Sequence, residues 1–196
     1  NSIGQPEIDE TPCKTTVEDD KVILQRHMEG IQAPPFWQMA MSANGLDPKA
    51  KVDRWQICRF TPPTHIMIDV GVALAGRGGF NASPEDKAYS VVVDFITPET
   101  ETSHWYHWGM ARQFKPNDAE LTVKIREGQG KIFNEDMEML QLQQANISLW
   151  PERKLLLLNI DSGGVQSRRI IDRLLAQEQE QNQVKIASQN TTGAAT

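Results

Sequence analysis

The sequence predicts an α+β fold, in which a curved antiparallel sheet carries one long helix packed across it. Strand-like segments separated by short turns come first along the chain, and helical segments follow them. The longest helical stretch, 125–147, contains no proline and is rich in good helix formers in its second half. A helix across a curved sheet encloses a cavity between the two, where ligands commonly bind.

Five segments have the composition of strands, and 65–74 is the clearest because it is rich in β-branched residues. The glycine-rich segment 75–87 follows it. We expect a hairpin loop there, because no lysine or Ser/Thr follows the glycines at the spacing of a phosphate-binding loop. The five expected strands are 22–32, 52–60, 65–74, 89–97 and 102–112.

Helices and loops are expected over the rest of the chain. Asp118 can cap a helix that begins near Ala119, and Gly128 and Gly130 predict a kink or junction before the long helix. The other expected elements are an extended or loop entry over 1–21, a short helix or irregular lid over 36–46, a buried strand or extended crossing over 155–160, a helix over 165–181 and a disordered polar tail over 182–196.

The long helix carries an acidic residue in an apolar setting. Helical spacing places Gln129, Phe133, Asp136 and Leu140 on one stripe, within a broad face that we expect to pack on the core. A carboxylate there either faces a cation or metal, or is an ordinary solvated helix acid, since burying it alone costs too much free energy. The spacing does not separate these two readings.

Composition limits the class of protein. With 196 residues, a net charge of -6 and 39% hydrophobic residues, the chain is long enough for one sizeable core and is a poor candidate for nucleic-acid binding. No apolar run is long enough to span a bilayer, and the polar N-terminus does not read as a signal peptide. The two cysteines, Cys13 and Cys58, form no metal-binding spacing and indicate no disulfide framework, so we expect a cytoplasmic protein.

The four histidines do not form a metal motif, because no HxxxH or HExxH pair is present. In the strand 102–112, alternation places His104, Tyr106 and Trp108 on one face and His107 on the other. A lone helix carboxylate beside an aromatic pocket does fit one chemistry, a mononuclear iron(II) held by two histidines and one carboxylate. Asp136 would be that carboxylate, and both histidines would come from outside this chain.

Four stretches together resemble the C-terminal catalytic domain of Rieske non-haem iron oxygenases, and most closely the subgroup of vanillate O-demethylase oxygenase subunits. They read VDRWQICRF, FITPETETSHWYHWGMARQF, KIFNEDMEMLQLQQANI and PERKLLLLNIDSGGVQSRRIIDRLLAQEQ. The resemblance implies a helix-grip (START-like) catalytic domain over 1–181. It also implies that the Rieske domain and the DxxHxxxxH segment with two iron histidines precede Asn1.

The resemblance implies an enzyme that uses O₂ to oxidise an aromatic substrate. The expected reaction is O-demethylation of a methoxylated aromatic acid, such as vanillate, to a phenol and formaldehyde. Asp136 is then the carboxylate ligand of the mononuclear iron. Substrate contacts are expected from His104, Tyr106, Trp108, Gln129 and Phe133. The implied cofactors are Fe(II), a [2Fe-2S] Rieske cluster and NAD(P)H acting through a separate reductase, and the implied assembly is a homotrimer.

A second hypothesis is a binding module of the same fold that holds a hydrophobic small molecule without metal. Asp136 separates the two hypotheses, because an iron site requires a carboxylate and an apolar binding pocket does not. A purely structural subunit is a weaker third reading, against which the aromatic residues Tyr106 and Trp108 speak.

Overall fold

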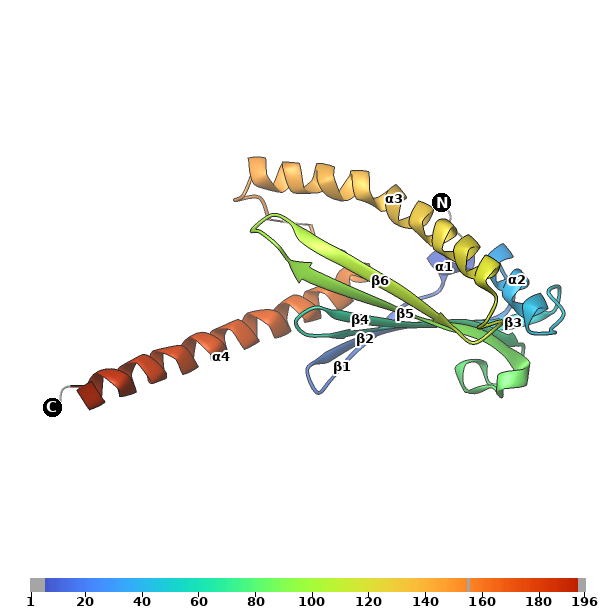
Figure 1. The fold of residues 1–196 in the computed structure, drawn as a ribbon, viewed down its shortest axis with the longest axis horizontal. Helices are drawn as coiled ribbons and strands as arrows, with labels where there is room; N and C mark the ends of the chain where they lie inside the picture. Colours follow the sequence, from blue (N-terminus) through green and yellow to red (C-terminus); the bar gives the residue numbers. More distant parts are fainter. Residues whose placement is uncertain (1–5, 155, 194–196) are drawn as a thin grey trace.

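A computed structural model describes residues 6–154 and 156–193 of the chain (Figure 1). Its centre is a 6-stranded antiparallel sheet with the strand order β1-β2-β3-β4-β5-β6, so each strand pairs with its neighbours along the chain. The strands are β1 (Lys14–Glu18), β2 (Lys21–Gln32), β3 (Lys51–Thr61), β4 (His65–Leu74), β5 (Lys87–Pro98) and β6 (His104–Arg112). The helices are α1 (Pro6–Glu10), α2 (Pro35–Ala43), α3 (Ala119–Leu149) and α4 (Ser162–Gly193), with 3-10 turns η1 (Gly79–Asn81), η2 (Pro84–Asp86) and η3 (Asn159–Asp161).

The ladder register divides the sheet residues between two faces. Tyr106 pairs with Ile96, and Trp108 pairs with Asp94, so these residues share the face that lies toward α3. We call it the helix face. Trp55 pairs with Gly71, which pairs with Tyr89, and this row lies on the opposite, outer face.

Each face carries its own apolar core. On the helix face, α2 packs on the sheet through Trp37, Ala40 and Met41, and Phe114 and Ile125 close the same cluster. On the outer face, Trp55 is buried and its ring meets Phe80 of η1 edge-on, with 5.9 Å between the ring centroids. The two cores hold the sheet at one end, and α3 leaves from that end across the helix face (Figure 1).

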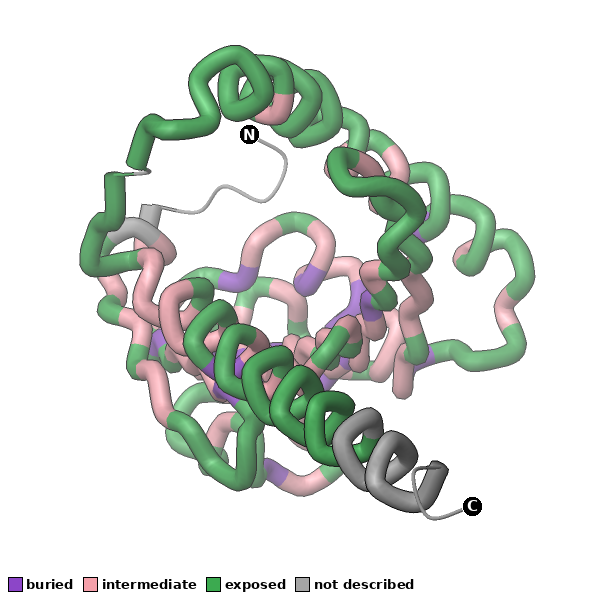
Figure 2. Tube along the Cα trace, turned by 90° about the vertical axis from the view of Figure 1, so that its left-hand side faces the viewer, coloured by how far each residue is buried: buried purple, intermediate pink, exposed green. Residues whose placement is uncertain are grey.

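The last helix begins against the far edge of the sheet. Thr15 and Ser162 share a hydrogen bond between their hydroxyl oxygens at 2.6 Å, and Arg173 forms an ion pair with Asp20. Beyond these contacts α4 extends away from the sheet, and most of it is exposed (Figures 1 and 2). Among the described helices, none combines the length and the apolar character that crossing a membrane requires.

The five expected strands are confirmed as β2 to β6, and the expected hairpin loop joins β4 to β5. The segment 1–21 was expected to be extended or a loop, and its extended part is the strand β1, whereas the short helix α1 was not expected. β1 was not among the expected strands because it is a short, largely polar edge strand that pairs only with β2. The region 36–46 contains a helix, α2, and the expected cap at Asp118 is confirmed.

The predictions for the second half of the chain were confirmed only in part. α3 is one continuous helix through Gly128 and Gly130, so the predicted junction was wrong, whereas the alternative of a kink agrees with the bend of α3 (Figure 1). Leu155 lies outside the described residues; the predicted buried strand was wrong, because 156–160 forms no strand and Leu156 is 84% exposed, whereas the extended backbone of Leu158 agrees with the alternative of an extended crossing. The segment 182–193 continues α4 where a disordered tail was expected, because proline is absent there and a formed helix extends easily.

Candidate functional site

The start of α3 is tied to the end of β6. The Asp118 carboxylate accepts a hydrogen bond from the Leu121 backbone N–H at 2.9 Å and so caps the helix. The Arg112 guanidinium donates to the backbone carbonyls of Lys115 and Asp118, at 2.9 and 2.8 Å. These bonds fix the direction in which α3 departs from the sheet.

The middle of α3 meets the sheet through aromatic rings. The Phe133 ring lies 5.5 Å from that of Tyr106 and 5.2 Å from that of Trp108, measured between centroids. Tyr106 and Trp108 therefore share the helix face, as their spacing on β6 predicts. On the other face Trp105 and His107 stack at 6.5 Å, so the prediction that His104 and His107 point to opposite faces is consistent with the ladder.

Asp136 lies on α3 one turn beyond Phe133, and it is exposed. Its carboxylate forms no hydrogen bond or ion pair with the residues that the structure describes, yet it lies near enough to Tyr106 for its charge to help raise the pKa of that phenol. The expected packing of the whole helix stripe was wrong, because Leu140 on the next turn is 59% exposed. Phe133 is thus the last residue of the stripe to pack against the sheet.

The other two residues that were expected to contact the substrate, Gln129 and His104, form no ring contact with Phe133, Tyr106 or Trp108. Gln129 is half-buried one turn before Phe133 on α3. His104 is exposed at the start of β6, opposite Pro98, and forms no hydrogen bond within the described part of the chain. The structure thus brings Phe133, Tyr106 and Trp108 together, places Asp136 beside them, and leaves His104 and Gln129 at the margin.

Asp94 was missed by the sequence reasoning. It lies on β5 on the helix face, is 2% exposed, and lies diagonally across the ladder from Tyr106. Burial raises the pKa of the Asp94 carboxyl, and the neighbouring Tyr106 hydroxyl opposes that rise. Burial first, and then the proximity and charge of Asp94, raise the pKa of Tyr106 well above its ordinary value. The signal was a single acid inside the apolar run YSVVVDFIT.

A second polar group lies on the helix face toward α1. Arg54 is 6% exposed, and burial, followed by the nearby charge of Arg26, lowers its pKa to about 10, while Glu7 of α1 opposes that shift. Arg26 donates to the Thr11 backbone carbonyl at 3.1 Å. The bond from Arg26 attaches the segment that follows α1 to the sheet.

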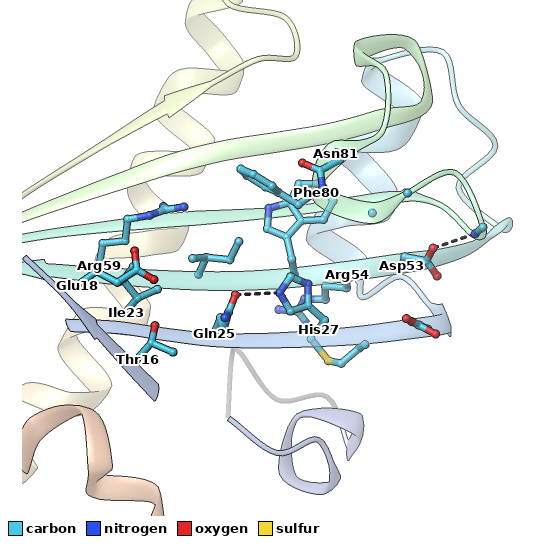
Figure 3. Close-up of a pocket in the computed structure, with 17 residues that line it drawn as sticks. Thr16, Glu18, Ile23, Gln25, His27, Asp53, Arg54, Arg59, Phe80 and Asn81 are labelled. Atoms are coloured by element: carbon cyan, nitrogen blue, oxygen red, sulfur yellow. Dashed lines mark hydrogen bonds between the residues drawn. The ribbon is translucent and has the colours of Figure 1, made fainter. Parts of the chain in front are cut away.

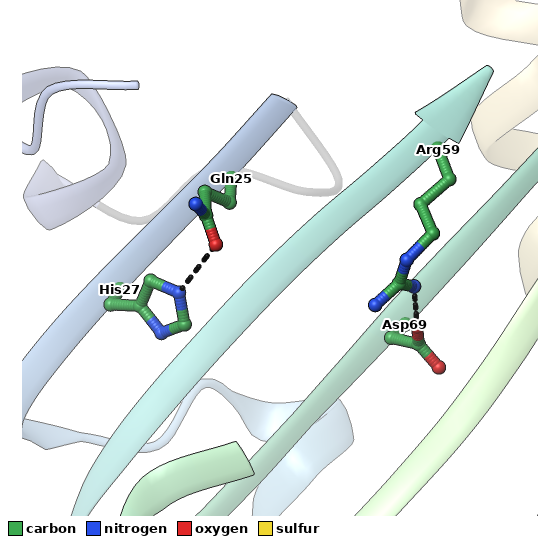
Figure 4. Close-up of polar contacts among 4 residues, drawn as sticks. All are labelled: Gln25, His27, Arg59 and Asp69. Atoms are coloured by element: carbon green, nitrogen blue, oxygen red, sulfur yellow. Dashed lines mark hydrogen bonds and ion pairs between the residues drawn. The ribbon is translucent and has the colours of Figure 1, made fainter. Parts of the chain in front are cut away.

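A pocket of about 730 Å³ lies on the outer face, away from all the expected site residues (Figure 3). Trp55, Ile57 and Phe80 form its apolar part, and Asp53, through its hydrogen bond to the Gly76 N–H at 2.8 Å, holds the loop at its rim. His27 contacts Gln25 at 3.4 Å, and Arg59 is paired with Asp69 (Figure 4). Asp53 and Arg59 are thus engaged in contacts within the sheet and its loop, and none of the expected site residues lines this pocket.

The described residues do not contain a complete metal site: no three of their His, Cys, Asp or Glu side chains are placed to hold an ion. Asp136 nevertheless fits the role of one carboxylate ligand, because its oxygens are uncommitted and exposed beside an aromatic surface. That further ligands come from outside this chain stays a prediction.

Comparison with known proteins gives a consistent result. A family model described as the vanillate O-demethylase oxygenase C-terminal domain matches residues 1–177. Two vanillate O-demethylase oxygenase subunits from strains of Pseudomonas sp. are similar to the chain: one is 66% identical over 178 residues, which is 91% of this chain and 54% of the relative. The other is 63% identical over 180 residues, which is 92% of this chain and 51% of the relative. The chain therefore spans about half the length of these curated relatives.

Solved structures share the fold. Dicamba monooxygenase bound to 3,6-dichlorosalicylic acid superposes with a TM-score of 0.72 at 22% identity, over 88% of this chain and 49% of that chain. Dicamba monooxygenase with non-heme iron and dicamba gives a TM-score of 0.67 at 23% identity, over 86% of this chain and 50% of that chain. The predicted α+β helix-grip architecture is confirmed by this likeness, which at such identity concerns the fold alone.

The match covers nearly the whole chain, and the 66% identical relative carries the same family name. The resemblance that the sequence motifs predicted is thereby confirmed, and the chain belongs to the family of vanillate O-demethylase oxygenase C-terminal domains.

Proposed function

We propose that the chain is the catalytic domain of an O₂-dependent aromatic monooxygenase, which O-demethylates a methoxylated aromatic acid to a phenol and formaldehyde. Family membership supports this proposal, since the relatives at 66% and 63% identity are named as vanillate O-demethylase oxygenase subunits. The observation that carries it is the uncommitted carboxylate of Asp136, one helical turn from the aromatic contact of Phe133 with Tyr106 and Trp108.

Asp136 would hold a mononuclear Fe(II), together with two histidines supplied from outside the chain. When bound, such an iron supplies a centre with open positions for dioxygen. The contribution of Asp136 itself is a fixed negative charge on a long helix whose N-terminus is capped and tied to β6. Among the described residues, no group of three His, Cys, Asp or Glu side chains could hold an ion, so Asp136 would be the one ligand that this part of the chain contributes.

The neighbouring side chains would bind and orient the substrate. Phe133, Tyr106 and Trp108 form an aromatic wall against which a substituted benzene ring can pack, which favours edge-to-face or offset contacts. His104 and Gln129, at the margin of that wall, would hydrogen-bond a phenol or carboxylate group of the ring. A substrate held in this way covers the wall and excludes water from the face of α3 that bears Asp136.

The remaining components are inferred at the level of the whole protein. The iron-sulfur subunit of toluene-4-sulfonate monooxygenase from Comamonas testosteroni is 36% identical over 135 residues, which is 66% of this chain and 38% of that relative. We infer a [2Fe-2S] Rieske cluster in the full-length protein, a separate reductase that uses NAD(P)H, a homotrimer, and a cytoplasmic location. Free Cys13 and Cys58 are compatible with that location.

The experiment replaces Asp136 in the full-length protein. Asp136→Ala and Asp136→Asn should abolish formaldehyde release from 4-hydroxy-3-methoxybenzoate, and should lower the iron content from about three to about two per chain while sulfide stays at about two. Glu138→Gln, an exposed acid two residues along the same helix, is the matched control and should keep activity and iron. Full activity of Asp136→Asn would refute the assignment.

The same pair of variants tests the alternative, a metal-free module for a hydrophobic ligand. That reading predicts that Asp136→Asn is harmless and that the wild-type protein contains no mononuclear iron. Membership of an oxygenase family does not favour it.

A further inference from the structure

The second half of α3 is apolar on the side that faces away from the sheet. With 3.6 residues per turn, Leu142 and Leu149 lie about half a turn round the helix from Phe133, which contacts the sheet. Met139 lies near them on that side. All three are exposed, Met139 by 68%, Leu142 by 55% and Leu149 by 70%. They therefore point away from the candidate site, which lies on the Phe133 side.

Exposed apolar side chains continue past the end of this helix. Trp150, the residue that follows α3, is 66% exposed, and four more large apolar residues are exposed before α4 begins. We call the whole set the outward α3 surface. It consists of Met139, Leu142, Leu149, Trp150, Leu156, Leu157, Leu158 and Ile160. Soluble monomers rarely expose apolar patches of this size, and such patches mark interaction sites.

The contacts that hold α3 lie elsewhere on the helix. Its start is tied by the Asp118 cap and by Arg112, and its middle packs on the sheet through Phe133. The second half then runs on above the hairpin of β5 and β6 (Figure 1). A helical segment that is apolar on the side opposite its own sheet is typically covered by further protein.

The relatives contain polypeptide that could cover this surface. The chain matches 54% of one Pseudomonas sp. relative and 51% of the other, so each relative has nearly as much chain again. The matching family model describes a C-terminal domain. Most of the unmatched polypeptide of these relatives therefore precedes the matched part.

Polypeptide that precedes α1 would enter on the same side of the sheet as α3. α1 lies on that side (Figure 1), and Arg26 of the helix face donates to the Thr11 carbonyl just after α1. An extended chain spans at most ~3.3–3.6 Å per residue, so roughly fifteen residues match the length of α3. A tethered segment also has an effective concentration in the millimolar range, which favours it over a separate partner.

We propose that the polypeptide preceding this chain in the full-length protein packs on the outward α3 surface. α3 then lies between two layers, with the sheet and the candidate site on its Phe133 side and the preceding polypeptide on the other. Asp136 is thereby carried by a helix that is packed from both sides. The inference goes beyond the proposed function, because it depends on the length of the relatives and on no particular reaction or substrate.

The outer face of the sheet offers a competing place for the same polypeptide. Met67, Phe95 and Trp105 are 46%, 39% and 58% exposed there. Polypeptide that enters beside α1 would have to pass round an edge of the sheet to reach them. Each of the two surfaces contains an exposed methionine and an exposed tryptophan, so the same chemical probe reports on both.

The test is hydroxyl-radical footprinting of the full-length wild-type protein, read by mass spectrometry of its peptides. Met139 should be labelled roughly fivefold more slowly than Met67, and Trp150 than Trp105, because residues at the centre of an interface lose their access to solvent. Without the preceding polypeptide the order would be the reverse, since Met139 and Trp150 are the more exposed of each pair. Labelling of Met139 and Trp150 as fast as that of Met67 and Trp105, or faster, would overturn the proposal.

Dilution separates the preceding polypeptide from a second copy of the protein. Protection within one polypeptide does not depend on protein concentration, whereas protection by a second copy is lost as the copies dissociate. Met139 should therefore stay protected when light scattering shows that the protein has become monomeric. Protection that disappears together with the oligomer would assign the surface to a second copy and overturn the proposal.

Charge substitution gives a second measurement. Leu142→Glu and Leu149→Glu place a carboxylate in the covered surface and should each lower the Tm of the full-length protein by roughly 4 °C or more. Leu175→Glu is the matched control on α4, where Leu175 is 51% exposed, and should lower the Tm by about 1 °C or less. Leucine and glutamate are both good helix formers, so helix propensity contributes little to the difference.

Equal Tm values for the three variants would contradict the proposal. If Leu142→Glu or Leu149→Glu does not fold, the footprint of the wild-type protein still decides. Failure of the proposed function would look different, because absent formaldehyde release changes neither the footprint nor the Tm.

Discussion

Phe133 is the side chain through which the middle of α3 contacts the sheet, so Phe133→Ala should loosen that helix. The variant removes two aromatic contacts, to Tyr106 and Trp108, which are typically worth ~0.5–1.5 kcal/mol each. Full burial of a phenylalanine is worth ~3–5 kcal/mol against alanine, and Phe133 is only partly buried, so we expect a loss of roughly 2 kcal/mol.

Native-state hydrogen exchange of the full-length protein, resolved by peptide, is the suitable assay because it reports the local opening of α3. A loss of roughly 2 kcal/mol corresponds to about 30-fold faster exchange of amides around Phe133, since 1.4 kcal/mol is a factor of about ten. Leu140→Ala is the matched control, because Leu140 lies on the same stripe but is 59% exposed, and it should change exchange by about twofold or less. Equal effects of the two substitutions would refute the idea that Phe133 anchors the helix.

Other parts of the structure make equally specific predictions. An added Cβ at Gly71 would lie 2.3 Å from Cζ2 of the buried Trp55, so Gly71→Ala should cost ~2–3 kcal/mol in urea unfolding, whereas Gly109→Ala, with 3.4 Å to its nearest neighbour, should cost less than ~0.5 kcal/mol. Asp118→Ala removes the cap of α3 and should cost about 1 kcal/mol, seen as faster exchange in the first turn of the helix. Because the folded-state pKa of Asp94 is raised, its contribution to the unfolding free energy is complete below its unfolded pKa and is lost as the pH rises through the raised value. The unfolding free energy of Asp94→Asn, minus that of the wild-type protein, should therefore increase from about pH 4 upward. A difference that stays constant across pH would contradict this sign.

Most of the sheet was predictable from the sequence because its strands are rich in β-branched and aromatic residues and are separated by turn residues. The segment 65–74 coincides with β4, and the alternation in 102–112 correctly placed Tyr106 and Trp108 on one face. The long helices were less predictable. The apolar residues of α3 predicted a core-facing stripe, but among its described residues only Ile125 is buried, since hydrophobic spacing shows which residues share a face and not what covers that face.

The candidate site also contains residues that the sequence predicted and one that it did not. Phe133 and its two ring partners follow from periodicity and composition, because each lies at a spacing that the local element dictates. Asp94 could not be found in this way, because its role depends on the pairing of β5 with β6, which places the Tyr106 side chain of the neighbouring strand near it. A lone acid in an apolar strand signals that some partner is required, but only the tertiary fold identifies the partner.

The exposure of Asp136 does not by itself separate a metal ligand from a solvated helix acid, because both have an accessible carboxylate. The difference lies in the surroundings. A solvated acid needs no fixed helix and no aromatic neighbours, whereas α3 is capped by Asp118, bonded to β6 through Arg112, and packed by Phe133 on Tyr106. Asp94 lies buried on the same face of the sheet, and its Oδ1 has no hydrogen-bond partner among the described residues, which reduces the stability of the sheet. Such a residue is the pattern expected where function and not folding determines the side chain.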